Sequence, residues 1–319
     1  MDRPGEAMSA RIVISEFMDA PAVERLAKRF EVDYRPKLVD DSAALEAALA
    51  PAQAWIVRNR TQVRGHALAA ATTLRVVGRL GVGLDNIDLA ACEARGIRVI
   101  PAGGANAQSV AEYVVTVALV LLRGAYFSTK AVAAGTWPRH TLSQGREAAG
   151  KTFGVVGFGS IGRLTAAKAL AMGMRVIGFD LQVRNDSPSW GQAGVEPRTL
   201  DALVAESDVV SLHLPLDDAT RGLFDAARLG RMKHDAILVN SARGGIVDEE
   251  ALAKLLHSGR LGGAALDVFE DEPLAAGSPL ATAPRLLLTP HIAGVTLEAN
   301  ERVSALIADR VAEALESGA

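Results

Sequence analysis

A histidine at the end of an apolar run is the first side chain in this sequence that could do chemistry. His291 follows three leucines, Thr289 and Pro290 in LLLTPHIAG. An imidazole gains or loses a proton near neutral pH, so His291 could act as a general acid and base. It could also simply cap the strand and hydrogen-bond a neighbour. The choice depends on which other side chains reach the same place.

Two more polar side chains follow apolar segments in this half of the chain. Arg243 ends AILVNSAR, and Glu272 lies in AALDVFEDEP. A guanidinium holds a carboxylate through two parallel hydrogen bonds, and a carboxylate beside an imidazole favours the protonated ring. Reduction of a 2-oxo acid needs such a clamp, a proton for the carbonyl oxygen and a hydride for the carbonyl carbon. We therefore predict Arg243, Glu272 and His291 as catalytic residues, although each alone would more often be a surface residue.

A glycine-rich segment supplies the expected hydride carrier. Gly157, Gly159 and Gly162 form a G-x-G-x-x-G between an apolar strand and a helix, and Asp180 follows 18 residues after Gly162, at the end of the next strand. In this pattern the glycines allow a tight turn, a close pyrophosphate and close helix packing, while the acidic residue accepts hydrogen bonds from the ribose. A glycine turn in an unrelated α/β fold is the alternative. Because a carboxylate repels a 2′-phosphate, we predict NAD rather than NADP.

Composition excludes several other functions. The net charge of −3 and the pI near 6.1 give no positive field to attract nucleic acid or an anionic membrane. The strongest apolar run, residues 114–122, is too short to span a bilayer, and one cysteine, Cys92, favours a reducing compartment. The remaining histidines show no metal-ligand spacing, so we expect no metal site. We predict a cytoplasmic protein, with Met8 as a possible alternative start.

The patterned segments predict an α/β protein with two doubly wound parallel-sheet domains. Apolar strands are expected at 11–15, 54–58, 75–81 and 98–103, and six more follow Lys151. Ser42, Asp88 and Asp248 each precede a helical segment and are predicted as its N-cap. Continuous apolar strands linked by helices are typical of parallel sheets covered on both faces. A helix over 109–124 is apolar nearly all round, so it must pack against something large, such as a second subunit. Ligands of such folds bind at the carboxyl ends of the strands.

Six segments in this order resemble the D-isomer-specific 2-hydroxyacid dehydrogenases: GRLGVGLDNID, NAQSVAEY, GFGSIG, NSARGGIVDEEAL, AALDVFEDEP and TPHIAG. The resemblance implies that Arg243, Glu272 and His291 are catalytic. It also implies a Rossmann NAD-binding domain at 104–291, inserted in a discontinuous flavodoxin-like substrate domain at 1–103 and 292–319. Family members are usually homodimers joined through the helix expected at 109–124.

The resemblance also assigns binding residues. Those implied at the NAD site, beyond the three glycines, are Ser160, Ile161, Asp180, Ser241, Ala242, Arg243, Asp267, His291 and Gly294. Those implied near the substrate are Val82, Gly83, Asn106 and Arg243.

The most similar branch is that of the phosphoglycerate dehydrogenases. AWIVRNRTQV and VVGRLGVGLDNID resemble their substrate loops and place Arg58 and Arg79 where cations meet the far end of the substrate. A solvated cluster of Arg58, Arg60 and Arg64 is the alternative. Arginines beside the pocket favour a distal anion, so 3-phosphoglycerate and sulfolactate are the expected substrate types. Hydroxypyruvate or glyoxylate reduction, and a non-enzymatic NAD-sensing corepressor, are the alternatives.

Overall fold

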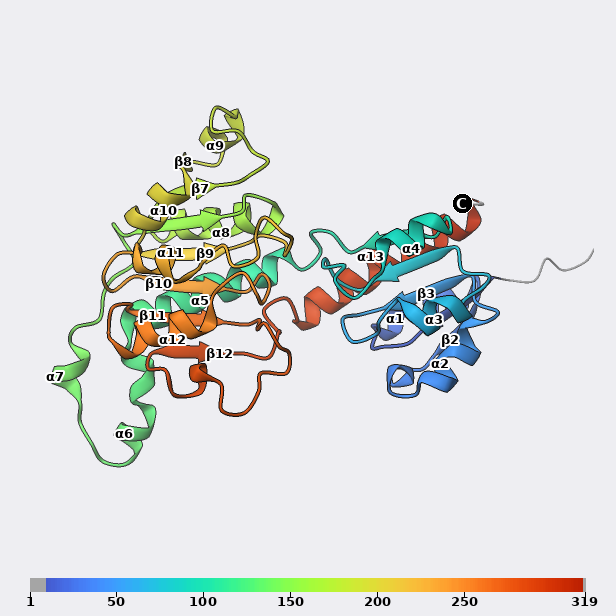
Figure 1. Cartoon of the computed structure of the whole chain (residues 1–319), viewed down its shortest axis with the longest axis horizontal. Helices are drawn as coiled ribbons and strands as arrows, with labels where there is room; N and C mark the ends of the chain where they lie inside the picture. Colours follow the sequence, from blue (N-terminus) through green and yellow to red (C-terminus); the bar gives the residue numbers. More distant parts are fainter. Residues whose placement is uncertain (1–9, 318–319) are drawn as a thin grey trace, which may run out of the picture. The chain divides into compact units, whose positions relative to one another are not determined.

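The computed structural model describes residues 10–317, which divide into two compact units (Figure 1). In the first unit, the chain up to Asn106 packs with the chain from Val295 onward, and the second unit is Ala107–Gly294. These limits lie a few residues from those expected from the sequence, 103 and 292. Met8, the possible alternative start, lies outside the described residues.

The first unit is built on a five-stranded parallel sheet of order β2-β1-β3-β4-β5. Its strands are β1 Arg11–Ile14, β2 Glu31–Tyr34, β3 Ala54–Val57, β4 Val76–Arg79 and β5 Arg98–Pro101. All four residues of β3 are buried, as expected for a central strand with both faces covered. This strand order is the flavodoxin-like one. The predicted fold of this unit is confirmed.

Helices cover both faces of this sheet. Helices α1 (Ala20–Ala27) and α13 (Leu297–Glu316) pack on one face. On the other face lie α2 (Ser42–Leu49), α3 (Gly65–Ala70) and α4 (Leu89–Ala94), and the 3-10 turn η1 spans Leu38–Asp40. A side chain at Gly78 would come within 2.7 Å of Val311. The closing helix therefore lies directly on β4 and completes the core of this unit.

The second unit has a seven-stranded parallel sheet of order β12-β11-β10-β9-β6-β7-β8 (Figure 1). Its strands are β6 Thr152–Val156, β7 Arg175–Phe179, β8 Glu196–Pro197, β9 Val209–Leu212, β10 Ile237–Asn240, β11 Gly263–Leu266 and β12 Leu286–Leu288. Six of them were expected, and the two-residue β8 is additional. The order reverses between β6 and β9, which is the Rossmann arrangement.

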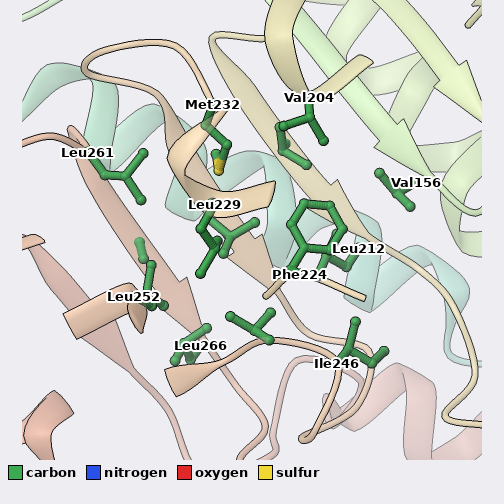
Figure 2. Packing of buried hydrophobic residues seen from close by; sticks show 14 of the residues in the cluster. Val156, Val204, Leu212, Phe224, Leu229, Met232, Ile246, Leu252, Leu261 and Leu266 are labelled. Carbon is green, nitrogen blue, oxygen red and sulfur yellow. The ribbon is translucent and has the colours of Figure 1, made fainter. Parts of the chain in front are cut away.

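Helices lie on both faces of this sheet as well. Packed on one face are α5 (Ala107–Arg123), α8 (Ser160–Ala171) and α9 (Pro188–Gln192). Packed on the other are α10 (Leu200–Glu206), α11 (Ala226–Gly230) and α12 (Glu249–His257), around a cluster that includes Phe224 and Leu252 (Figure 2). The 3-10 turn η3 spans Pro279–Thr282.

Between α5 and β6 the chain makes an excursion from the rest of the unit (Figure 1). It carries η2 (Ala125–Ser128), α6 (Thr129–Ala133) and α7 (Arg139–Leu142). No single described helix is long and apolar enough to cross a membrane; the bent pair Ala107–Arg123 and Ala125–Ala133 passes only by length and composition. Helix α5 buries nine of its residues inside the unit, so its apolar character serves the core.

Helix ends follow the expected capping chemistry with one correction. The side chains of Asp88 and Asp248 accept hydrogen bonds from first-turn N–H groups, as predicted. Ser42, expected to cap α2, is instead its first helical residue. The cap is Asp41, whose carboxylate accepts from the Ala44 N–H at 3.0 Å.

Candidate active site

The three predicted catalytic side chains follow three consecutive strands of the second unit. Arg243 comes after β10, Glu272 after β11 and His291 after β12, and these strands are hydrogen-bonded neighbours. Their carboxyl ends therefore share one edge of the sheet. The first two loops also touch, because a side chain at Gly244 would lie 1.7 Å from the carbonyl oxygen of Phe269.

His291 and Glu272 form an ion-pair geometry at this edge. Imidazole Nδ1 lies 2.8 Å from Glu272 Oε2, and the two side chains are 38% and 35% exposed. Glu272 Oε1 accepts from the Phe269 N–H at 3.2 Å. Because Nδ1 faces the carboxylate, Nε2 is the ring nitrogen left to exchange a proton with a ligand. His291 has φ of +55°, a conformation that non-glycine residues rarely adopt and that needs support from its surroundings.

Asp267 provides that support. Its side chain is buried, and Oδ1 accepts from the Ile292 N–H and the Thr289 hydroxyl while Oδ2 accepts from the Ala293 N–H. Its carbonyl oxygen accepts from the His291 N–H at 2.8 Å. The sequence prediction placed Asp267 at the NAD site. The structure shows it fixing the backbone on both sides of the histidine.

Thr289 extends this network to α5. Its hydroxyl lies 2.5 Å from Asp267 Oδ1 and 2.7 Å from the Tyr113 hydroxyl. Burial raises the pKa of Tyr113, so its hydroxyl stays neutral. The sequence analysis missed both residues as positioning groups. The available signal was a threonine interrupting LLLTPH, directly before the proline and the histidine.

Asn240 holds the arginine loop in a similar way. It is the last residue of β10 and is buried. Its amide donates to the Arg243 carbonyl oxygen at 2.9 Å and accepts from the Ala242 N–H at 3.0 Å. Asn240 was also missed, although an asparagine closing an apolar strand is a visible signal. The guanidinium of Arg243 donates to the Ala242 carbonyl oxygen at 2.6 Å.

The glycine-rich loop follows β6 and has the geometry of a phosphate cradle. Gly157 has φ of +99°, and a side chain at Gly162 would lie 2.0 Å from the Gly157 carbonyl oxygen. A side chain at Gly159 would meet nothing within 4 Å, so the space beside it is open. Gly159 is also the N-cap of α8 and offers no side chain to the first-turn N–H groups. An anion can accept from them, so the loop fits the pyrophosphate of a dinucleotide.

Asp180, at the end of β7, ties this loop to the next one. One carboxylate oxygen accepts from the Phe158 N–H at 2.6 Å, and the other accepts from Gln182 and Val183. The Phe158 ring stacks on Trp190 with centroids 4.1 Å apart. The loop is therefore held in place by a side chain below it and a carboxylate beside it, which preorganises it for a ligand.

Two of the predicted binding residues carry buried polar atoms that have no hydrogen-bond partner within residues 10–317. They are Ser241 Oγ, just after β10, and Asn106 Oδ1, at the end of the first unit. A buried polar atom without a partner costs free energy, so such atoms are typical of ligand sites. The buried Ser241 hydroxyl without a partner among these residues therefore supports the fit of the second unit to NAD.

The other predicted NAD-site residues also lie at this carboxyl edge or beside it. Ser160 and Ile161 begin α8, Ala242 precedes the arginine, and Gly294 closes the histidine loop. From β7 to β12, the edge therefore presents Asp180, the glycine-rich loop and the three predicted catalytic side chains in turn. That order suits a dinucleotide lying across the strand ends.

His213, at the end of β9, is the second histidine at this edge and has a different environment. Its Nε2 lies 2.9 Å from Ser211 Oγ, and its carbonyl oxygen packs against Gly157. Burial lowers its pKa to about 3. The ring is therefore neutral at physiological pH and does not compete with His291 as an acid.

The first unit has its own polar edge at the carboxyl ends of its strands. Arg58 follows β3 and Arg79 ends β4, while Val82 and Gly83 lie in the next loop. Within the described chain, the one hydrogen bond of the Arg58 guanidinium goes to Asn300 Oδ1, at 3.0 Å, and Phe17 lies under it. Burial lowers the pKa of Arg58, and Glu16 opposes that shift. No carboxylate of the described chain contacts this half-buried guanidinium, which suits it to an anionic ligand.

Comparisons with known proteins agree with this geometry. Residues 115–293 match the D-isomer specific 2-hydroxyacid dehydrogenase family, NAD binding domain. The chain is 51% identical over 304 residues to the (S)-sulfolactate dehydrogenase of Chromohalobacter salexigens, covering 95% of this chain and 98% of that one. It is 40% identical to the D-3-phosphoglycerate dehydrogenase of Mycobacterium leprae over 95% of this chain but 56% of that relative. The D-lactate dehydrogenase of Aquifex aeolicus, solved with NAD and lactic acid, superposes with a TM-score of 0.84 at 30% identity over 97% of this chain and 96% of that one.

The fold and the site define an NAD-dependent oxidoreductase that acts on a 2-hydroxy acid. The chain belongs to the D-isomer specific 2-hydroxyacid dehydrogenase family.

Proposed function

We propose that this protein interconverts a D-configured 2-hydroxy acid and its 2-oxo acid, with a distal sulfonate on the substrate: sulfolactate and 3-sulfopyruvate. The observation that carries the proposal is the Arg58 guanidinium at the carboxyl edge of the first unit, which is half-buried and has no carboxylate in contact among residues 10–317. The 51% identity to an (S)-sulfolactate dehydrogenase over nearly both full lengths supports the same substrate.

The (S) configuration of sulfolactate is consistent with a family that is specific for D-isomers. Sulfur outranks the carboxylate oxygens in the naming rules, so the CH2–sulfonate group takes priority over the carboxylate in sulfolactate. The (S) label therefore describes the same spatial arrangement as in a D-2-hydroxy acid such as D-lactate. A D-specific hydride transfer fits this substrate without inversion of the site.

In the proposed mechanism, Arg243 clamps the substrate carboxylate through its guanidinium. During oxidation, His291 Nε2 removes the proton of the C2 hydroxyl. NAD, held by the glycine-rich loop, would supply the acceptor for the hydride from C2, so that proton and hydride loss together would leave the carbonyl. During reduction, the protonated His291 returns that proton to the oxygen. Glu272, at 2.8 Å from Nδ1, stabilises the protonated ring and keeps Nε2 toward the substrate.

In this proposal the first unit binds the distal group of the substrate. Arg58 and Arg79 bind the distal anion, Val82 and Gly83 contact the substrate through their loop, and Asn106 Oδ1 accepts a hydrogen bond from bound ligand. The first unit then serves as the substrate domain and the second as the dinucleotide-binding domain, the region that matches the family's NAD binding domain.

The second unit holds the cofactor in the same proposal. Gly157, Gly159 and Gly162 cradle the pyrophosphate, with Ser160 and Ile161 beside it, and Asp180 accepts from the ribose hydroxyls. The carboxylate beside the ribose disfavours a 2′-phosphate. Ser241, Ala242, Asp267 and Gly294 complete the predicted lining.

A phosphate in place of the sulfonate gives the second candidate substrate, 3-phosphoglycerate. The 40% identity to a D-3-phosphoglycerate dehydrogenase supports it, although the chain spans only 56% of that relative. Hydroxypyruvate and glyoxylate offer Arg58 no distal anion to bind. A purely NAD-sensing role gives the paired His291 and Glu272 no function. These alternatives are not favoured.

We also propose a homodimer formed through α5 and the excursion that follows it. Four exposed apolar side chains lie in the excursion that follows α5: Tyr126, Phe127, Val132 and Trp137, the last 76% exposed. Monomers seldom leave such a patch in water. Light scattering after size exclusion tests this, with Trp137→Glu expected to shift the mass toward the monomer. The single cysteine, Cys92, is consistent with a cytoplasmic location.

A panel of 2-oxo acids tests the proposed reaction. NADH oxidation is followed by its absorbance, and kcat/KM is compared among 3-sulfopyruvate, 3-phosphohydroxypyruvate, hydroxypyruvate and pyruvate. The expected order places 3-sulfopyruvate first. A preference for pyruvate would contradict the role of Arg58 and Arg79, and silence across the panel would favour a sensing role.

A further inference from the structure

Three consecutive residues directly after β1, Ser15, Glu16 and Phe17, all contact the loop that follows β3. This loop, residues 58–61, is called the Arg58 loop below. Strands β1 and β3 are hydrogen-bonded neighbours, so both segments lie at the carboxyl edge of the first sheet. Glu16 is 5% exposed, and the catalytic proposal gives it no role. Because a carboxylate is rarely buried unless its oxygens are paired, its partners indicate what the segment does.

The Glu16 carboxylate binds the main chain of the Arg58 loop. Oε2 accepts from the N–H groups of Arg58 and Thr61, at 2.8 and 3.0 Å, and Oε1 accepts from that of Arg60 at 3.2 Å. Three of the four N–H groups of the loop therefore converge on one side chain. A change in the backbone of the loop would leave buried polar groups unpaired, which costs free energy. Glu16 thus fixes the main chain from which the Arg58 side chain extends.

Other buried side chains hold the same loop. Ser15 Oγ lies 3.1 Å from Thr61 Oγ1 and accepts from the Trp55 indole at 3.0 Å. The Asn86 amide donates to the carbonyl oxygens of Arg58 and Thr61, at 2.8 and 2.6 Å. Because these four side chains are buried, water does not compete for their hydrogen bonds. The main chain at Arg58 is therefore held in one conformation before a ligand binds.

Phe17 acts on the Arg58 side chain rather than on its main chain. The ring lies under the guanidinium, with 5.6 Å between Cζ and the ring centroid, and Asn300 Oδ1 accepts from Nη2 at 3.0 Å. Phe17 is 47% exposed, so its ring contributes little to the core. A cation over an aromatic face is favoured in one position, and the N–H groups that Asn300 does not use can donate to an anion.

We propose that Glu16 and Phe17 are positioning residues for Arg58, Glu16 through the main chain and Phe17 through the guanidinium, and that together they strengthen the preference for acids with a distal anion. This rests on the proposed function, in which Arg58 binds the distal group. Ordering a long side chain on binding costs conformational entropy, and a side chain that is already held avoids part of that cost. An acid without a distal anion makes no use of Arg58, so its binding does not depend on this arrangement.

Glu16→Gln tests the main-chain part of the proposal. Glutamine keeps the shape of the side chain, but its NH2 group faces N–H groups that need an acceptor. The measured quantity is the ratio of KM for 3-sulfopyruvate to KM for hydroxypyruvate, with NADH saturating. We expect this ratio to rise about three- to tenfold, the upper limit being the loss of one charge-assisted contact. The kcat for 3-sulfopyruvate should change less than about twofold, because Arg58 contributes to binding rather than to the chemical step.

Asp208→Asn is the matched control for Glu16→Gln. Asp208 Oδ2 also accepts from a backbone N–H, that of Thr152 at 2.8 Å, but Asp208 directly precedes β9 and lies at the amino edge of the other sheet. This variant should lower the melting temperature and leave the KM ratio unchanged. An equal rise of the ratio in both variants would trace the effect to general destabilisation and would overturn the proposal.

Phe17→Leu tests the side-chain part and remains decisive if Glu16→Gln does not fold, because the exposed ring adds little to the core. The KM ratio should rise about two- to fivefold, as expected for the loss of a cation–π contact at an exposed site. Phe30→Leu is its control, since Arg29 lies over the Phe30 ring at 5.5 Å and Phe30 directly precedes β2, at the amino edge of the same sheet. Equal rises in the two variants would show that the position beside Arg58 is irrelevant and would refute the role of Phe17.

A second background shows whether Glu16 acts through Arg58. In Arg58→Gln protein, Glu16→Gln should raise the ratio by less than about twofold, because both changes remove the same contact. Effects that multiply would place the action of Glu16 elsewhere and contradict the proposal. If Arg58→Gln abolishes a preference for 3-sulfopyruvate while Glu16→Gln and Phe17→Leu leave the ratio unchanged, the positioning role is wrong and the proposed function stands. A parent protein without that preference would remove the proposed function, and this inference with it.

Discussion

The carboxyl edges of the two sheets differ in the kind of group that they present to a ligand. The edge of the second unit uses backbone geometry: a glycine turn at Gly157, a helix start at Gly159 without a side-chain cap, and a histidine loop whose backbone is held by Asp267. The edge of the first unit uses side-chain charge, Arg58 above Glu16. On the proposed function, the second unit handles what all 2-hydroxy acids share, and the first unit reads what differs among them. Substitutions in the second unit should therefore affect all substrates alike, and those in the first should change their ranking.

The largest effect is expected at His291. His291→Asn removes the proton donor, and we expect kcat for 3-sulfopyruvate to fall by about 10²–10⁴-fold, with the same factor for hydroxypyruvate. NADH affinity, measured by fluorescence titration, should change little, because the phosphate loop is untouched. A variant that loses activity for one substrate only would contradict the division between the two edges.

Much of the carboxyl edge of the second unit could be predicted from the sequence, because each of its main features lies within a short segment. The glycine spacing around Gly159 and a histidine after a strand-ending proline each lie within one short segment. The helix caps at Asp88 and Asp248 are equally local, and Ser42 was mistaken for a cap because Asp41, an equally good cap, precedes it.

What the sequence did not reveal depends on pairs far apart in the chain. Asp267 reaches across 22 residues to Thr289, and Tyr113 across 176. Asp40 meets Arg60 over 20 residues, and Arg58 meets Asn300 over 242. No spacing rule predicts such contacts, because tertiary packing decides which loops become neighbours. The short strand β8 was missed for a related reason, since two residues carry no periodicity.

The second largest effect is expected at Arg243. Arg243→Lys keeps the charge but loses the paired hydrogen bonds to the substrate carboxylate, so kcat/KM should fall by about 10–100-fold. The loss should be similar for every acid in the panel, since all of them carry that carboxylate. An Arg243→Lys protein that discriminates newly between 3-sulfopyruvate and hydroxypyruvate would place Arg243 at the distal group instead.

A smaller and selective effect is expected at Arg58. Arg58→Gln should raise KM for 3-sulfopyruvate about tenfold, because one charge-assisted contact to the distal anion is lost. Hydroxypyruvate has no distal anion, so its kinetic constants serve as the internal control and should stay within about twofold of the parent. Equal losses for both acids would mean that Arg58 supports the fold through Asn300 and Phe17 rather than binding the sulfonate.

The smallest effect concerns stability and separates the two histidines of the second edge. His213 has a pKa of about 3 in the folded protein because it is buried, against about 6.5 for an unfolded histidine. Between these values the unfolded chain binds the extra proton, so the free energy of unfolding falls as the pH falls from about 6.5 toward 3. His213→Gln removes this pH-dependent contribution to the free energy of unfolding and keeps a polar partner for Ser211. From pH 7 to pH 5, urea denaturation should show the variant losing about 1–2 kcal/mol less stability than the parent. His66→Gln, at an exposed position, is the control and should lose as much as the parent. An identical pH dependence in all three proteins would show that the folded protein accommodates a charged His213, and the two histidines would then differ in position alone.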